Sequence, residues 1–127
     1  MIVGLGLDLF DISRMETEFR KADPGFTSQL FTDHEIACCE RQRCPAEHFA
    51  LYFAAKEAVA KALPGGERVA LAWRDIAIVG DSAGGYQVIL HGLAKARAES
   101  RGVRRILLSV ARAGGVASAS VVLESSP

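Results

Sequence analysis

The residues best placed to do chemistry in this chain are a glutamate and a lysine in one alanine-rich run. Glu57 and Lys61 stand four apart within residues 53–63, so they share one face if that run is helical. Alanines flank them on nearly every side, which indicates a buried helix, where charged side chains are rare unless they have a purpose. A hard cation with phosphate oxygens would supply that purpose, because magnesium takes one or two protein carboxylates and completes its shell with water and substrate phosphate.

Asp8 is the candidate for the second carboxylate, and a strand over residues 2–9 would position it. Side chains alternate along this stretch, with Val3, Leu5, Leu7 and Leu9 on one side and Ile2, Gly4, Gly6 and Asp8 on the other. The two glycines leave the Asp8 face without bulky side chains, so a ligand or another backbone can approach it closely. Asp8 and Glu57 are then the expected magnesium ligands, and Lys61 is expected to hold or protonate a phosphate.

Each of these groups also has an ordinary structural interpretation. Asp8 would serve as the cap of a following helix, and Glu57 with Lys61 would form a surface ion pair worth about 0.3–0.5 kcal/mol. A dinucleotide-binding loop is excluded, because the third glycine that it needs is absent at position 9. The three cysteines have histidines nearby but fit no zinc-binding spacing, so we interpret them as buried or idle thiols: Cys38, Cys39 and Cys44.

A second candidate anion-binding site is the segment that ends in Gly114-Gly115. The preceding strand carries the hydroxyl of Ser109 and the guanidinium of Arg112. A strand end of this kind beside a glycine turn can bind an anion, and it can equally be an ordinary hairpin tip.

The remaining pattern predicts an α+β fold with a mostly antiparallel sheet packed with helices. Helices are expected from about Asp11 to Lys21, from Asp33 behind a Thr32–Glu35 capping box, over Pro45–Leu63, and from about Leu93 to Ser100. Strands are expected over residues 2–9, 75–79, 86–91, 106–112 and 116–124, the last four forming two hairpins across Ser82–Gly85 and Ala113–Gly115.

Length and composition limit the class of protein. The 127 residues suit a single domain over 1–127, on a prior of roughly 100–200 residues per domain. Fifteen basic and fifteen acidic residues give no net charge, so the usual signature of nucleic-acid or membrane-surface binding is missing. No apolar run reaches the roughly eighteen residues of a spanning helix, and the N-terminus lacks the basic region of a signal peptide. Three closely spaced cysteines do not make a secreted disulfide framework, and we expect a cytoplasmic location.

The segments, taken in order, resemble the holo-[acyl-carrier-protein] synthase family of 4′-phosphopantetheinyl transferases, in its short bacterial form. The most specific stretch is Phe53-Ala54-Ala55-Lys56-Glu57-Ala58 with Lys61. It combines with the matching strand around Asp8, and the similarity covers nearly the whole chain. The other matching positions are Ile12, Arg14, Leu30-Phe31-Thr32, Glu35, Trp73, Asp75-Ile76, Leu108-Ser109, Ala117 and Val121-Val122-Leu123.

This resemblance implies a magnesium-dependent transfer of the phosphopantetheine arm of coenzyme A to a serine of an apo acyl carrier protein, with adenosine 3′,5′-bisphosphate released. Asp8 and Glu57 would hold the metal against the pyrophosphate, Glu57 or a water that it orients would activate the serine, and Lys61 would contact the pyrophosphate. The family also implies a homotrimer with its site between subunits, a role in fatty-acid biosynthesis, and docking of the acidic carrier near Arg14 on the first helix.

Two departures from the family pattern concern the nucleotide end of coenzyme A. Tyr52 stands where the family usually has arginine, and Ser109-Val110-Ala111-Arg112 replaces a Ser-x-Ser-His strand end. We expect Tyr52, Ser109 and Arg112 to lie at the coenzyme site, with Arg112 able to bind a phosphate as a permanent cation. The alternatives are a non-catalytic relative that binds a carrier protein or another partner, and a small α+β domain without phosphate chemistry.

Overall fold

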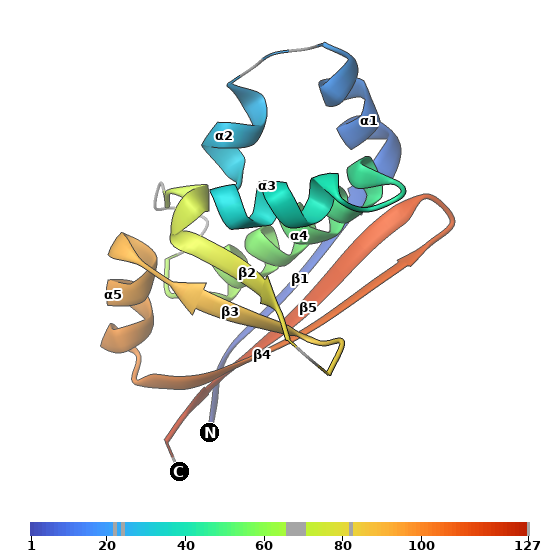
Figure 1. Ribbon diagram of the computed structural model, residues 1–127. Coiled ribbons are helices and arrows are strands. Elements are labelled where there is room, and N and C mark those ends of the chain that lie inside the picture. Colours follow the sequence, from blue (N-terminus) through green and yellow to red (C-terminus); the bar gives the residue numbers. More distant parts are fainter. Residues whose placement is uncertain (22, 24, 66–70, 82, 127) are drawn as a thin grey trace.

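The longest helix, α4 (Pro45–Ala62), lies at the centre of the fold, and the other elements pack around it (Figure 1). The computed structural model describes residues 1–127 except 22, 24, 66–70, 82 and 127. Its other helices are α1 (Ile12–Arg20), α2 (Phe26–Leu30), α3 (Asp33–Glu40), α5 (Gly92–Ser100) and a 3₁₀ turn, Trp73–Asp75. Its strands are β1 (Ile2–Asp11), β2 (Ile76–Gly80), β3 (Tyr86–Leu90), β4 (Val103–Ala113) and β5 (Val116–Ser125).

The strands form two antiparallel sheets, one of three strands in the order β1-β5-β4 and one of two strands, β2-β3. In the larger sheet Asp8 lies opposite Ala119, which lies opposite Val110 on the far strand. All of these pairings are antiparallel and α4 packs against both sheets, so the predicted α+β fold is confirmed.

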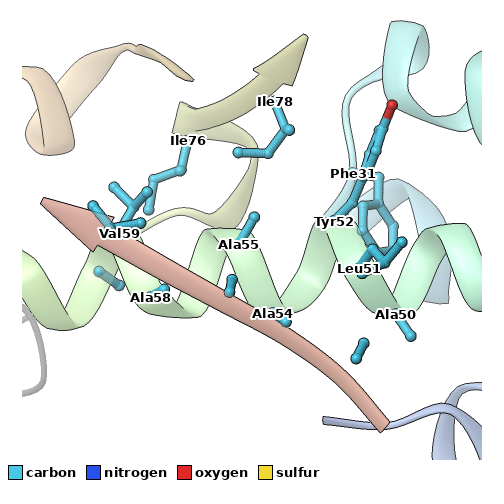
Figure 2. Close-up of a cluster of buried hydrophobic side chains, with 14 of the residues drawn as sticks. Phe31, Ala50, Leu51, Tyr52, Ala54, Ala55, Ala58, Val59, Ile76 and Ile78 are labelled. Carbon is cyan, nitrogen blue, oxygen red and sulfur yellow. The ribbon is translucent and has the colours of Figure 1, made fainter. Parts of the chain in front are cut away.

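The inner face of the three-stranded sheet packs against α4, while β2 covers the helix from another side. Figure 2 shows Ile76 and Ile78 of β2 pointing toward Ala55 and Val59 of the helix. The sheet contributes small and medium-sized side chains, all buried: Ala117, Ala119, Val121 and Leu123. The abundant alanines of α4 therefore allow a helix to be enclosed on several sides.

The two glycines of β1 are needed for the helix to approach this strand. A Cβ atom at Gly6 would fall on the carbonyl oxygen of Ala58, and one at Gly4 on that of Ala62. The glycine-containing face of β1, which the sequence predicts to lack bulky side chains, therefore packs directly against the backbone of α4. This close packing places Asp8 beside the helix.

Replacing Gly6 by alanine is expected to lower the free energy of unfolding by about 1–3 kcal/mol, because the new methyl group meets helix backbone. Gly80→Ala is the matched control: a Cβ at Gly80 meets nothing within 4 Å, so this variant should unfold at the same denaturant concentration as the parent protein. Equal stability of the two variants in urea unfolding would contradict the contact between β1 and α4.

The outer face of the three-stranded sheet is exposed and carries a stripe of leucines. Leu5, Leu7 and Leu9 are 67%, 61% and 65% exposed. Across the strands they continue into three rows, which we call the outer-face rows: Leu5-Val122-Leu107, Leu7-Ser120-Ser109 and Leu9-Ser118-Ala111. The leucines of β1 therefore point away from the core, and the glycine-containing side points into it. The alternation predicted from the sequence fails at the start of the strand, where the pairing with β5 shifts register: Val3 packs against the core and Ile2 is exposed.

The structure confirms the expected helices and strands, with small shifts at their ends. The capping box is present, because the Thr32 side chain accepts from the Glu35 amide and the Glu35 carboxylate accepts from the Thr32 amide. The short helix α2 was not predicted, since its five residues carry no periodic pattern. Position 82 of the expected Ser82–Gly85 turn lies outside the described residues.

A fully buried ion pair, which the sequence analysis missed, ties the helices to the small sheet. Lys56 Nζ lies 2.8 Å from Glu35 Oε1, and both side chains are 0% exposed. Lys56 also donates to the carbonyl oxygens of Trp73 and Ile76, and Glu35 accepts from the Ile78 amide. The capping box gave no signal for this ion pair, because the Glu35 oxygen that accepts from the Thr32 amide, Oε1, is the same one that Lys56 contacts, while Oε2 accepts from Ile78.

Candidate active site

Asp8, Glu57 and Lys61 come together where β1 crosses α4, as the sequence predicted. Asp8 is 6% exposed, and its Oδ1 atom lies 2.9 Å from Lys61 Nζ. Lys61 Nζ also donates to the carbonyl oxygen of Leu7, at 3.2 Å. Asp8 therefore sits in the middle of the strand, paired with α4, and does not cap the following helix, whose N-cap is Asp11.

Glu57 lies on α4 close enough to Asp8 for the two carboxyl groups to influence each other's charge. Burial, followed by the neighbouring Asp8 carboxylate, raises the pKa of Glu57 to about 7, while Lys61 and Arg14 act in the opposite direction. Two carboxylates this close favour either a shared proton or a bound cation.

The local donor set fits a magnesium ion. Asp8 Oδ2 is buried and makes no hydrogen bond, although a buried carboxylate oxygen ordinarily has a partner. Among the described residues no cluster of three or more His, Cys, Asp or Glu side chains could hold a metal, so a site here rests on two carboxylates. Magnesium accepts such a small protein contribution when water and phosphate oxygens complete its shell.

Arg14 lies near this group, on the exposed side of α1. Its guanidinium carbon is 5.0 Å from the ring centroid of Phe10, and its charge lowers the pKa of Glu57 against the larger effects of burial and Asp8. Beside it is a mainly apolar hollow of about 240 Å³, lined by Phe10, Arg14, Met15, Glu18, Phe26, Leu30 and Phe53. One of its lining residues, Phe53, lies one helical turn before Glu57 on α4.

Arg112 lies at the end of β4, where it forms an ion pair with Glu47 in the first turn of α4. Its Nη1 atom is 2.8 Å from Glu47 Oε2, and the two side chains are partly exposed. They border an open hollow of about 560 Å³, with Asp11, Ser13 and Glu16 of the α1 region on its other wall. Burial and the Arg112 charge lower the pKa of the neighbouring His48.

The other two predicted coenzyme contacts lie apart from Asp8 and Glu57. Ser109 is in the outer-face rows, on the opposite side of the sheet from Asp8. Tyr52 is 7% exposed and packs edge-to-face against Tyr86, with ring centroids 5.7 Å apart. It belongs to the cluster of buried hydrophobic side chains drawn in Figure 2. This position indicates a packing role for Tyr52, so its contact with coenzyme stays a prediction without structural support.

Comparisons with known proteins agree with this fold and show the family of the chain. The family model of the 4′-phosphopantetheinyl transferase superfamily matches residues 4–116. This chain belongs to that superfamily.

Its relatives narrow the family to the holo-[acyl-carrier-protein] synthases. The synthase of Geotalea daltonii is 38% identical, with 98% of this chain and 99% of the relative covered. Among solved structures, the synthase of Neisseria meningitidis matches with a TM-score of 0.86 at 32% identity, covering 98% of this chain and 100% of the other. The synthase of Helicobacter pylori, solved in complex with coenzyme A, matches with a TM-score of 0.80 at 25% identity, covering 94% and 99%.

Proposed function

We propose that this protein transfers the 4′-phosphopantetheine arm of coenzyme A to a serine of an apo acyl carrier protein, using Mg²⁺ and releasing adenosine 3′,5′-bisphosphate. The observation that carries the proposal is that Asp8, Glu57 and Lys61 lie next to one another, and that the buried Oδ2 atom of Asp8 has no hydrogen-bond partner. Two adjacent carboxylates beside a lysine suit a divalent cation that must itself face phosphate oxygens.

Each of the three residues has a separate role in this proposal. Asp8 and Glu57 hold the metal, which when bound neutralises charge that develops on the pyrophosphate. Glu57, directly or through a water that it orients, takes the proton of the carrier serine as its oxygen attacks the β-phosphorus atom. Lys61, held by Asp8 at the mouth of the site, contacts the pyrophosphate and stabilises the departing adenosine bisphosphate.

Magnesium binding should depend on pH, because Glu57 must lose its proton to ligate the metal. Its raised pKa of about 7 means that binding releases a proton at pH 6 but almost none at pH 8. The apparent Mg²⁺ affinity should therefore fall as the pH drops through 7, approaching about tenfold per pH unit. Calorimetric titrations in buffers of different ionisation enthalpy would count the protons, and a pH-independent affinity would contradict Glu57 as a ligand.

The carrier protein is proposed to dock on α1. Arg14 supplies a positive charge for an acidic partner, and the apolar hollow beside it offers a socket for a hydrophobic side chain near the transferred serine. Arg112 is proposed to bind the nucleotide end of the coenzyme. We also propose a cytoplasmic location and a role in fatty-acid biosynthesis, as the family resemblance implies. In the part of the chain that the structure describes, no helix has the length and apolar character of a membrane span.

A homotrimer is proposed on the basis of the outer-face rows, whose leucines would be covered by neighbouring subunits. In such an assembly Ser109 would reach a coenzyme held by the carboxylate pair of a neighbour, although it cannot reach the pair of its own chain through the sheet.

Leu7→Glu is expected to convert the trimer to monomers, because it places a charge in the middle row. Ile89→Glu, at a 45% exposed position on the small sheet, is the control that should stay trimeric. Light scattering after size exclusion measures the mass; a monomeric parent protein, or a trimeric Leu7→Glu variant, would contradict this assembly.

The proposed activity is tested by incubating the protein with coenzyme A, Mg²⁺ and an apo carrier protein and weighing the intact carrier. The expected result is a gain of one phosphopantetheine, which disappears when a chelator is added and returns with excess Mg²⁺. A folded protein that binds carrier but modifies none of several carriers would overturn the proposal and favour a non-catalytic binding protein.

A further inference from the structure

We propose that Glu47 is a positioning residue that holds the guanidinium of Arg112 for the 3′-phosphate of coenzyme A. This inference rests on the proposed function, in which Arg112 binds the nucleotide end of the coenzyme. Glu47 lies at the start of α4, whereas Arg112 lies on β4. Through Arg112, Glu47 would determine how strongly the enzyme prefers coenzyme A to a coenzyme that lacks the 3′-phosphate.

The contact leaves part of the guanidinium available. Glu47 Oε2 accepts from Arg112 Nη1 at 2.8 Å, and within the described part of the chain Arg112 makes no other hydrogen bond through its side chain. A guanidinium has five N–H donors in one plane, so its Nε and Nη2 edge can still bind two phosphate oxygens. The pairing thus fixes the plane of the guanidinium without using the edge that would meet the phosphate.

The two residues differ in how firmly the fold holds them. Glu47 lies in the first turn of an 18-residue helix, where the helix dipole favours a negative charge. Arg112 is the last residue but one of β4, just before a turn in which Gly114 and Gly115 have positive φ. A long side chain at a hairpin end has many conformations in solution, and Glu47 restricts them before the coenzyme arrives.

If Glu47 acted on the coenzyme only through its negative charge, its removal would strengthen phosphate binding, which is the opposite of what a positioning role predicts. Asp11 and Glu16 line the same hollow, so the single arginine already faces several carboxylates. If these groups acted only through repulsion, removing any one of them would strengthen the binding of an anion. If Glu47 positions Arg112, its removal weakens phosphate binding, whereas removal of Glu16, which is ion-paired to Arg20 at 3.7 Å, does not.

The experiment is a calorimetric titration of coenzyme A and of dephospho-coenzyme A, which lacks the 3′-phosphate, into four proteins. Glu47→Ala should weaken coenzyme A binding about three- to tenfold, which lies in the lower part of the range of couplings between neighbouring groups, and leave dephospho-coenzyme A within about twofold. Glu47→Gln, which keeps an acceptor for Nη1, should retain most of the affinity. Glu16→Ala should bind coenzyme A as tightly as the parent protein or more tightly.

The inference is overturned if Glu47→Ala binds coenzyme A as tightly as the parent protein, or if it loses affinity for both coenzymes equally. It is also overturned if the parent protein does not distinguish the two coenzymes. In each of these cases phosphopantetheine transfer by the parent protein would show that the proposed function stands. Absence of both coenzyme binding and transfer would instead overturn the proposed function together with this inference.

Discussion

Lys56→Met is expected to lower the free energy of unfolding by about 3–5 kcal/mol, because it leaves the Glu35 carboxylate buried without its cation. The loss should lower the unfolding midpoint by more than about 10 °C. Burial lowers the pKa of Lys56, and the neighbouring Glu35 opposes that shift, as expected for an ammonium group whose charged state depends on its partner. Thermal unfolding followed by circular dichroism measures the change.

Two further variants separate this effect from the general cost of changing a lysine. Lys21 is paired with Glu18 at 3.0 Å, but its side chain is 61% exposed, so Lys21→Met should change stability by less than about 0.5 kcal/mol. The double variant Glu35→Gln with Lys56→Met should be more stable than the sum of the single changes predicts, because it leaves no unpaired charge. Additive losses would argue that the two groups act independently.

Glu57→Gln should reduce transfer to the carrier by at least about 100-fold while stabilising the metal-free protein. The folded-state pKa of Glu57, about 7, exceeds its ordinary value of 4.5, so ionisation is disfavoured in the folded protein. This penalty is complete above pH 7 and absent below 4.5, so the added stability should appear at pH 8 and vanish as the pH falls through 7 toward 4.5. Urea unfolding at several pH values, without Mg²⁺, measures it.

Glu40→Gln, at an exposed position on α3, is the matched control and should alter neither transfer nor stability. If Glu57→Gln kept full activity, Glu57 would be neither a metal ligand nor the group that activates the serine. If Glu57→Gln were less stable than the parent protein at pH 8, this would contradict the inferred cost of ionising Glu57, which comes first from burial and then from Asp8.

The sequence was sufficient for the main elements and for the grouping of Asp8, Glu57 and Lys61. Alternation along β1 placed Asp8 on the glycine face, and the four-residue spacing of Glu57 and Lys61 placed them on one side of α4. These are local regularities, which depend on the period of a strand or a helix. The capping box at Thr32 and Glu35 is local in the same sense, and the structure confirms it.

Contacts between distant segments could not be predicted in this way. The pairing of Glu35 with Lys56 depends on how α3 crosses α4, and that of Glu47 with Arg112 on where the β4–β5 hairpin meets the start of α4. Tyr52 illustrates the same limit, because no local pattern indicates that its ring packs against Tyr86, 34 residues further along the chain. The apolar face of β1 was visible as a pattern, but the pattern did not reveal that α4 would cover the opposite face.

The most direct test of the central claim is to measure metal bound at the Asp8 and Glu57 pair, using Mn²⁺ as a spectroscopic substitute for Mg²⁺. Titrations followed by electron paramagnetic resonance, with coenzyme A present, would compare the parent protein with Asp8→Asn and Glu57→Gln. We predict one Mn²⁺ per subunit in the parent protein, displaced by Mg²⁺, and a large loss of affinity in both variants. Equal Mn²⁺ binding by all three proteins would contradict the assignment of this carboxylate pair as the metal site of the transferase.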